Sequence, residues 1–188
     1  MTEKKDSGKS GDLIEKCRKG DRKAQFEVYG LYYKAMYNAC LRFVSRPSEA
    51  EDIMQEAFLA AFRKIDTYKG DVSFGAWLKR IVINKSIDAL RQRKIRFEES
   101  IEDPNNLAEA AIDFEDADQS QIENGIKLIT EAIPELPRGY QVVLSLALIE
   151  GYDHEEIAQL LSISASTSRS QLARAKKKLA EAIKNKRK

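Results

Sequence analysis

Charge is distributed unevenly along the chain, and this distribution restricts how the chain can be divided into domains. Residues 94–125 hold 10 acidic side chains against 2 basic ones, together with Pro104, Asn and Gly. This segment has no sustained helical or strand period, so it predicts an acidic linker. The flanking segments are basic, with 19 Lys and Arg against 13 Asp and Glu in residues 1–93, and 11 against 7 in residues 126–188. We therefore expect two small domains joined by the linker.

The composition excludes several classes of protein. The chain has 188 residues, 43% of them hydrophobic, which is enough to build packed cores. No run approaches the roughly 18 apolar residues of a membrane span, and the start MTEKKDSGKSGD lacks the apolar stretch of a secretion signal. We predict a cytoplasmic protein without membrane insertion, beginning with a flexible tail at residues 1–10. Cys17 and Cys40 have no CxxC partner and are expected as reduced core thiols, with no metal site and no cofactor.

A helical period runs through the apolar residues that follow Gly20. Asp21 is expected to cap the first long helix. The predicted buried stripe of this helix recurs every three or four positions and consists of Val28, Tyr32, Ala35, Ala39 and Phe43. One side of the helix therefore belongs to a core, and the helix is expected to stop before Pro47.

Two more helices are predicted before the linker. Ser48 and Glu51 have the spacing of a capping box, so they are expected to open the second helix. Its predicted buried stripe is Met54, Phe58, Ala61, Phe62 and Ile65. After the turn TYKGD at residues 67–71, Ser73 is expected to cap a third helix that runs to about Arg93. That helix is apolar on more than one side but carries one polar stripe, Arg80, Asn84, Asp88 and Arg91.

The C-terminal part shows a helix-turn-helix pattern. Pro137 is well placed at the first turn of a helix that ends at Gly151. Asp153 and Glu156 form another capping box, which opens a short helix before the turn at residues 162–164. The last helix is expected to turn inward Leu172, Ala175, Leu179 and Ile183. A short helix, a tight turn and a longer basic helix are typical of this DNA-binding motif.

The opposite side of the last helix has a composition that suits DNA. Its predicted outward residues are Thr167, Arg169, Ser170, Gln171, Arg174 and Lys177. Hydroxyl and amide groups come first, where a recognition helix meets base edges, and cations follow, where phosphates lie. Taken alone, the same pattern is compatible with a solvated face of a helical hairpin.

Three blocks of the chain resemble one known family. Residues 51–94 resemble the second conserved region of extracytoplasmic-function (ECF) sigma factors, with the segments DIMQEAF and WLKRIVIN. Residues 19–33 resemble the opening helix of that region, and residues 136–179 resemble the fourth region. The resemblance covers most of the chain in the family's order. It implies an all-α fold with sigma region 2, of three to four helices, at residues 11–93, and the helix-turn-helix of sigma region 4 at residues 126–188.

The resemblance also implies a function. Such factors bind core RNA polymerase and direct it to specific promoters, whose DNA they recognise and melt. They are usually held by an anti-sigma factor. The chain has one His, no nucleophile motif and no Gly-rich phosphate loop, so we expect no enzyme activity. We expect a monomer when the protein is free, because no coiled-coil seam is present.

In the first domain the resemblance assigns residues to two partners. Asp52, Gln55 and Glu56 match the surface that grips the coiled coil of the polymerase's largest subunit, although a solvated helix face would look the same. The residues expected to contact the minus-ten element are Tyr68, Lys69, Asp71, Asn84 and Lys85. Tyr68 offers a face on which a flipped base can stack, but it is equally compatible with a partly buried core position.

In the second domain the six outward residues of the last helix become contacts to the minus-thirty-five element. Arg169, Ser170, Gln171 and Arg174 match family positions that read this element. The chain departs from the commonest pattern, Gly-Thr-Val-Lys-Ser-Arg, because Gln171 stands where Arg is usual. An adenine reader thus replaces a guanine reader. The acidic linker matches the segment that these factors thread through the polymerase cleft, with a solvated tether as the alternative.

Two other functions remain open from the residues alone. A free-standing helix-turn-helix regulator, with residues 1–93 as a sensor or dimerisation domain, would bind palindromic duplex DNA without polymerase. A helical adaptor with no DNA role would tolerate neutralisation of Arg169 and Arg174. The D-x-x-Q-E surface favours a sigma factor, because neither alternative needs a polymerase-binding surface beside a loop suited to single-stranded DNA.

Overall fold

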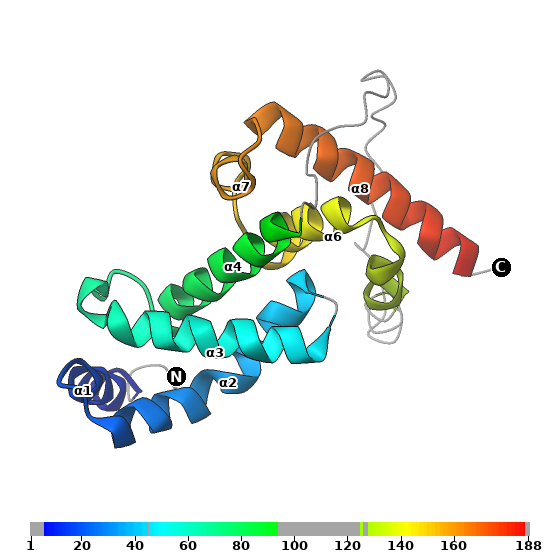
Figure 1. The fold of residues 1–188 in the computed structure, drawn as a ribbon. Coiled ribbons are helices and arrows are strands. Elements are labelled where there is room, and N and C mark those ends of the chain that lie inside the picture. The colour runs from blue at the N-terminus through cyan, green and yellow to red at the C-terminus, as the bar shows by residue number, and fades with distance from the viewer. Residues whose placement is uncertain (1–5, 45, 94–124, 126–127, 187–188) are drawn as a thin grey trace. The chain divides into compact units, whose positions relative to one another are not determined.

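The protein is described by a computed structural model that divides into two compact units between Arg93 and Lys94 (Figure 1). The described residues are 6–44, 46–93, 125 and 128–186, with side chains from residue 11 onward. These ranges are helical and contain no strand. Apart from Gly125, the predicted acidic linker lies outside them. Within them, no helix combines the length and the apolar character needed to cross a membrane.

Four α-helices and one 3-10 turn build the first unit. They are α1 (Asp6–Arg18), α2 (Arg22–Phe43), α3 (Pro47–Arg63), the 3-10 turn η1 (Ile65–Thr67) and α4 (Phe74–Gln92). Helices α2, α3 and α4 pack against one another, and α1 packs on α2 and η1 (Figure 1). The expected three- to four-helix arrangement is confirmed. Because α1 begins at Asp6, helical structure extends into residues 1–10, which the sequence predicted as a flexible tail.

The core of the first unit lies between α2, α3 and α4. Its largest fully buried side chains include Met36, Phe43, Met54, Leu78, Ile83, Ile87 and Leu90. Val28 and Phe43 of the stripe predicted for α2 are buried, but Ala35 is exposed and Met36 takes its place in the core. The predicted helical period of the buried stripe is confirmed, but the prediction that Ala35 is buried is wrong.

Two predicted capping residues of this unit are confirmed. Asp21 Oδ1 accepts hydrogen bonds from the backbone N–H groups of Lys23 and Ala24, at 2.8 and 3.3 Å. Ser73 Oγ accepts one from the N–H of Ala76 at 3.2 Å. These side chains satisfy backbone donors that the first turns of α2 and α4 leave without an intrahelical acceptor.

The start of α3 differs from the prediction. The helix begins at Pro47 with Arg46 as its N-cap residue, and no side chain caps it. Proline at the first helical position has no backbone N–H to leave without a partner, and its ring fixes φ near the helical value, so it is favoured at the start of a helix. Ser48 therefore lies inside the first turn, and the predicted capping box of Ser48 and Glu51 is wrong.

Both cysteines lie in the packed part of the first unit. Cys17 and Cys40 are free and buried, as predicted. Burial raises the pKa of both thiols, that of Cys40 to about 11. A hydrogen bond from Ser86 to Cys40 partly offsets the effect of burial on the Cys40 pKa. Thiols with raised pKa values remain protonated at neutral pH and are poor nucleophiles. We assign them a packing role.

The second unit contains a helix-turn-helix and the helices that precede it. Its elements are a helical stretch at residues 128–132, the 3-10 turn η3 (Ile133–Glu135), α6 (Arg138–Leu144), the π-helical turn η4 (Ser145–Ile149), α7 (His154–Leu161) and α8 (Ala165–Lys186). Helix α8 packs on α6 and α7. Ala175 and Leu179 lie in the core cluster, and Leu172 and Ile183 are partly buried against it, so the predicted inward stripe of the last helix is confirmed.

The helix ends of this unit also follow the sequence closely. The capping box is confirmed, because Asp153 Oδ1 accepts from the N–H of Glu156 at 2.7 Å and Glu156 Oε2 accepts from the N–H of Asp153 at 3.1 Å. Pro137 is the N-cap residue of α6 and not part of its first turn, which is a shift of one position. The π-helical turn extends α6 to Ile149, and Gly151 follows with φ of 74°.

Gly75, near the start of α4, lies against α2. A Cβ at Gly75 would lie 2.9 Å from Cε1 of Tyr32. Gly75→Ala should lower the free energy of unfolding by about 1–3 kcal/mol, because overpacking outweighs the better helix propensity of Ala. Gly30→Ala in α2 is the matched control, with nothing within 4 Å of its Cβ position, and should raise that free energy by about 0.5–1 kcal/mol. Urea denaturation measures both, and equal stabilisation by the two would contradict the close contact.

Candidate functional site

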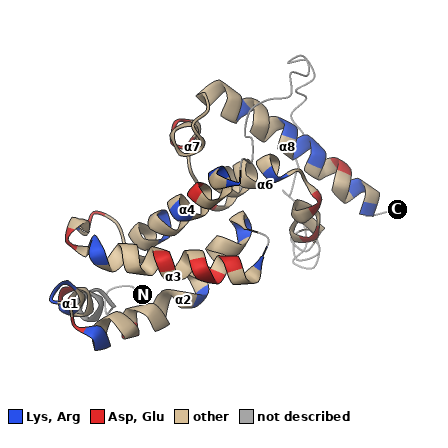
Figure 2. Ribbon diagram, in the orientation of Figure 1, with Lys and Arg blue, Asp and Glu red and all other residues tan. Residues whose placement is uncertain are grey.

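Helix α3 presents a polar face on the side opposite its core contacts. Asp52, Gln55 and Glu56 are all exposed, whereas Met54 and Phe58 are buried. Spacings of three and four residues place the three polar side chains on one side of the helix. Figure 2 marks the acidic positions along α3 in red. The structure therefore brings together the three residues predicted to bind polymerase.

One ion pair connects this polar face to α4. Lys85 Nζ lies 3.2 Å from Glu56 Oε2, and both side chains remain partly or largely exposed. An exposed pair of this kind contributes about 0–1 kcal/mol, so either member can exchange its partner at small cost. A residue predicted for the minus-ten element is thus a neighbour of one predicted for polymerase.

The turn between α3 and α4 is held by ring packing and hydrogen bonds. The ring of Tyr68 meets that of Phe74 edge-on, with centroids 5.4 Å apart, and that of Trp77 at 5.5 Å. Its hydroxyl donates to the carbonyl oxygen of Val72 at 2.8 Å. Its own main-chain carbonyl accepts a hydrogen bond from Arg18. Tyr68 is half-buried, so the structure places its ring in an aromatic cluster, which corresponds to the core alternative considered above.

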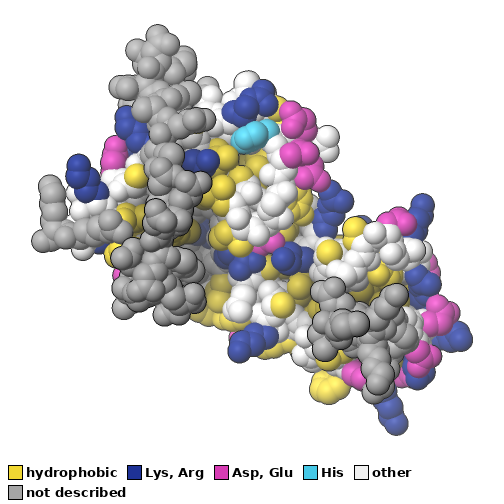
Figure 3. All heavy atoms as spheres, turned by 180° about the vertical axis from the view of Figure 1, so that it is seen from behind, with side chains coloured by type: hydrophobic (Ala, Val, Ile, Leu, Met, Phe, Trp, Pro, Cys, Tyr) yellow, Lys and Arg dark blue, Asp and Glu magenta, His cyan; other side chains and the backbone are white. Residues whose placement is uncertain are grey.

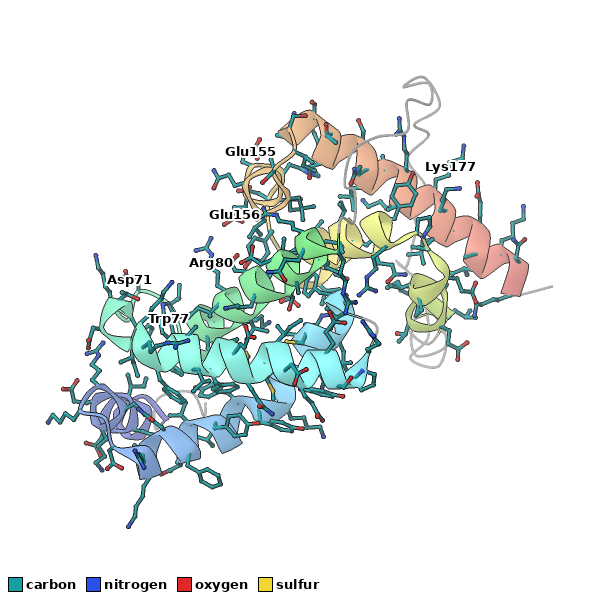
Figure 4. All side chains as sticks on the ribbon, in the orientation of Figure 1. Asp71, Trp77, Arg80, Glu155, Glu156 and Lys177 are labelled. Carbon is teal, nitrogen blue, oxygen red and sulfur yellow. The ribbon has the colours of Figure 1, made fainter. Side chains whose placement is uncertain are left out.

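The exposed tip of this turn consists of Lys69, Gly70 and Asp71. Gly70 has φ of 86°, a conformation that strains any residue with a Cβ. Asp71 at the tip, and Trp77 and Arg80 on α4, are labelled in Figure 4. The tip presents one cationic and one anionic side chain on a backbone whose two ends are fixed.

The predicted minus-ten residues do not form a single cluster. Asn84 is exposed and Lys85 half-buried, and Asn84 lies ten positions after Phe74, which is roughly 15 Å along the helix. Arg80 is exposed one turn before Asn84 on the same stripe. The sequence contained this signal, because Arg80 belongs to the predicted polar stripe, but it was not among the predicted site residues. The predicted minus-ten residues are thus divided between the turn tip and the polar stripe of α4.

Most of the predicted DNA-binding residues of α8 reach solvent. Arg169 and Lys177 are exposed, and the remaining accessible members are half-buried, namely Thr167, Ser170 and Arg174. Figure 2 shows basic residues along α8 in blue. Arg169 Nη1 lies 3.7 Å from Glu155 Oε1 of α7, and both side chains are exposed, so this ion pair is weak.

Gln171 is the exception on this helix. Its side chain is only 4% exposed, so its predicted place on the outward face is wrong. Ser168, Gln171 and Ala175 are buried at spacings of three and four residues, which define one inward stripe. The sequence held this information, because Gln171 precedes the inward Ala175 by four positions. Its polar character suggested the opposite side.

Short contacts fix α7 against the start of α8. His154 Nδ1 lies 2.9 Å from Ser168 Oγ, and the histidine is half-buried, visible in cyan in Figure 3. Ser164 Oγ accepts from the backbone N–H of Thr167 at 3.0 Å, which satisfies a donor in the first turn of α8. The His154–Ser168 contact therefore connects the first residue of α7 to the first turn of α8.

Comparisons with known proteins agree with both units. The family described as Sigma-70 region 2 matches residues 28–95, and the family described as Sigma-70, region 4 matches residues 126–179. The RNA polymerase sigma-H factor of Pseudomonas aeruginosa is 31% identical over 178 residues, which cover 91% of this chain and 92% of that protein. The ECF RNA polymerase sigma factor SigW of Bacillus subtilis is 29% identical over 181 residues, which cover 92% and 95%.

The chain is an ECF sigma factor of the sigma-70 family. As a sigma factor, it is a transcription initiation factor that directs RNA polymerase to promoters, as the sequence predicted. Its fold resembles that of the sigma factor RpoE in complex with the anti-sigma factor NepR from Bartonella quintana. That match has a TM-score of 0.51 at 20% identity and covers 84% of this chain and 95% of that one. CnrH, in complex with the cytosolic domain of CnrY, gives a TM-score of 0.51 at 22% identity over 92% and 96% of the two chains.

The burial of Gln171 in this sigma factor leads to a stability prediction. Gln171→Ala should lower the free energy of unfolding by about 1–3 kcal/mol, because it leaves a cavity between α8 and its neighbours. Lys177→Ala, on the exposed side of the same helix, should change it by no more than about 0.5 kcal/mol. Urea denaturation monitored by circular dichroism distinguishes the two. Equal, small effects would show that the Gln171 side chain is not packed.

Proposed function

We propose that this sigma factor binds core RNA polymerase through the polar face of α3, formed by Asp52, Gln55 and Glu56. The observation that supports this is the grouping of three exposed polar side chains on a helix whose other side is committed to the core. Carboxylate and amide oxygens at this spacing suit a partner helix that presents cations and hydrogen-bond donors.

The second proposed surface takes the single-stranded minus-ten element. It consists of the turn tip with Lys69 and Asp71, and the α4 stripe of Arg80, Asn84 and Lys85. The cations suit phosphates, and the amide of Asn84 suits a base edge. Because the stripe continues along α4, the surface has the length to accompany several nucleotides. Tyr68 supports the turn from within its aromatic cluster and exposes only part of its ring to a base.

The third proposed surface is the start of α8, which enters the major groove of the minus-thirty-five element. Arg169 and Ser170 reach base edges, with Thr167, Arg174 and Lys177 on the backbone. Gln171 contributes by packing beneath this surface, so the departure from the family's common Arg acts on the shape of the helix-turn-helix. The acidic segment 94–125 connects the two DNA-reading units within the polymerase.

We expect no enzyme activity from the chain itself and a cytoplasmic location, where polymerase and promoters are found. Promoter opening then draws on binding free energy. The solved relatives RpoE and CnrH were each determined with a partner, NepR and CnrY. We expect an anti-sigma factor to hold this chain in the same manner, by covering surfaces that polymerase and DNA require.

The double substitution Gln55→Ala, Glu56→Ala should weaken binding to core RNA polymerase by about 10- to 100-fold, because it removes two polar contacts near the centre of the proposed interface. The matched control is Glu27→Ala, Gln92→Ala, which removes the same residue types at exposed positions outside α3. Fluorescence anisotropy with labelled sigma factor and increasing amounts of polymerase measures the dissociation constants. Identical affinities for both double variants would refute the assignment of the α3 face.

For the third surface, Arg169→Ala should weaken binding of the holoenzyme to a duplex carrying its minus-thirty-five element by about 5- to 100-fold. Lys184→Ala, an exposed cation near the end of α8, is the control and should leave that affinity nearly unchanged. Electrophoretic mobility shift assays provide the comparison. Tight binding of a palindromic duplex by the sigma factor without polymerase would instead favour a free-standing regulator.

A further inference from the structure

The turn between α3 and α4, which is proposed to bind the minus-ten element, is hydrogen-bonded to helix α1. Arg18 Nη2 donates a hydrogen bond to the main-chain carbonyl of Tyr68, a residue 50 positions later in the chain. The other branch of the guanidinium, Nη1, lies 3.3 Å from Glu15 Oε2. A planar guanidinium with its two branches held in this way has a defined orientation. Arg18 precedes the residues 28–95 matched by the family.

Arg18 is itself held in place by the packing of α1. The neighbouring Cys17 is 2% exposed and Ile14 is 8% exposed, so one side of α1 is buried. The end of α1 is closed by Gly20, with φ of 79°. The N–H of Gly20 donates to the carbonyl of Cys17 at 3.0 Å, and the N–H of Asp21 donates to that of Lys16 at 3.1 Å. This pair of bonds is a Schellman motif, and it fixes the corner between α1 and α2.

The carbonyl that Arg18 binds is at the base of the turn. The N–H of Tyr68 donates to the carbonyl of Ile65 at 3.1 Å, and Thr67 Oγ1 donates to the carbonyl of Lys64 at 2.7 Å. After the exposed tip, the Tyr68 hydroxyl closes the turn on Val72. The peptide that follows Tyr68 leads directly into the tip. The hydrogen bond from Arg18 to the Tyr68 carbonyl therefore limits rotation of this peptide, which sets the direction of the Lys69 side chain.

We propose that Arg18 is a positioning residue for promoter opening, which orders the minus-ten turn through the Tyr68 carbonyl without touching DNA itself. This inference rests on the proposed role of the turn tip. A turn already ordered before DNA arrives loses less conformational entropy on binding, so the single strand is held more tightly. The bond with Arg18 is charge-assisted, and its side chain is partly shielded at 32% exposure, so water replaces it incompletely.

The experiment measures the affinity of the holoenzyme, formed from core polymerase and the full chain, for single-stranded DNA. The probe is a fluorescent oligonucleotide selected by the wild-type holoenzyme from a randomised single-stranded pool. Arg18→Met should weaken its binding about 3- to 10-fold, as expected for loss of one charge-assisted hydrogen bond at a partly exposed site. Arg18→Lys keeps a donor for the carbonyl and should recover part of the loss. Lys19→Met removes a neighbouring exposed cation and is the matched control, with an unchanged affinity expected.

Two further readouts separate positioning from other effects. Arg18→Met should leave the salt dependence of oligonucleotide binding unchanged, whereas loss of a direct phosphate contact would reduce the log–log slope by about 0.7. Hydrogen–deuterium exchange of residues 68–73 should be faster in Arg18→Met than in the wild type. Binding to core polymerase should be equal for both, which excludes a general folding defect.

Asp71→Ala at the tip separates the test of the proposed minus-ten surface from the test of the positioning role of Arg18. If Asp71→Ala weakens oligonucleotide binding and Arg18→Met does not, the positioning role is overturned and the proposed minus-ten surface stands. If neither substitution has an effect, both the surface and the positioning role are overturned. A reduced salt slope for Arg18→Met would also overturn positioning, because it would make Arg18 a phosphate contact.

Discussion

The mutual packing of α2, α3 and α4 is the constraint on which the first unit depends. Each helix commits one side to a shared core that buries side chains such as Phe43, Met54 and Leu78. Once Met54 and Phe58 face inward, the helical period turns Asp52, Gln55 and Glu56 to solvent. The surface proposed for polymerase is therefore a geometric consequence of the core. Mutations of the core are expected to disturb that surface by rotating α3, even at sites that contact no partner.

The turn between α3 and α4 presents a second constraint, because a loop proposed to bind single-stranded DNA must be both accessible and ordered. Its backbone polar groups and one aromatic ring are held at the base, by Phe74, Trp77, Val72 and Arg18. The tip from Lys69 to Asp71 is exposed, whereas the Tyr68 ring is half-buried. This division explains how Tyr68 takes part in a packed cluster while lying beside residues suited to DNA. Order at the base reduces the entropy that binding at the tip must offset.

Local chemistry made much of the fold predictable from the sequence. The caps Asp21 and Ser73, and the box of Asp153 with Glu156, are satisfied within a few residues, so their patterns are sufficient. Two of the mistaken predictions arose where one residue type has competing uses. Ser48 was read as a cap, although Pro47 opens α3 without one. Gln171 was read as an outward polar residue, although its helical phase places it with Ala175 in the inward stripe.

The candidate site was less predictable, because its support comes from residues distant in the chain. The bond from Arg18 to Tyr68 joins α1 to the turn before α4, and the pair of Lys85 with Glu56 joins α4 to α3. No spacing in the sequence indicates either contact. The resemblance to ECF sigma factors predicts the surfaces residue by residue. The resemblance does not distinguish a residue that is exposed to a partner from one that is buried under the surface, as the burial of Gln171 shows. That distinction requires the tertiary structure.

Transcription reconstituted from purified components can show whether this chain gives RNA polymerase its choice of promoter. Core polymerase, with and without the chain, would transcribe linear templates that carry a randomised upstream region, and the RNA 5′ ends would be sequenced. We expect start sites that depend on the chain and share two upstream sequence elements at a fixed spacing, one for each unit. A chain that binds polymerase but yields no such shared elements would contradict this expectation.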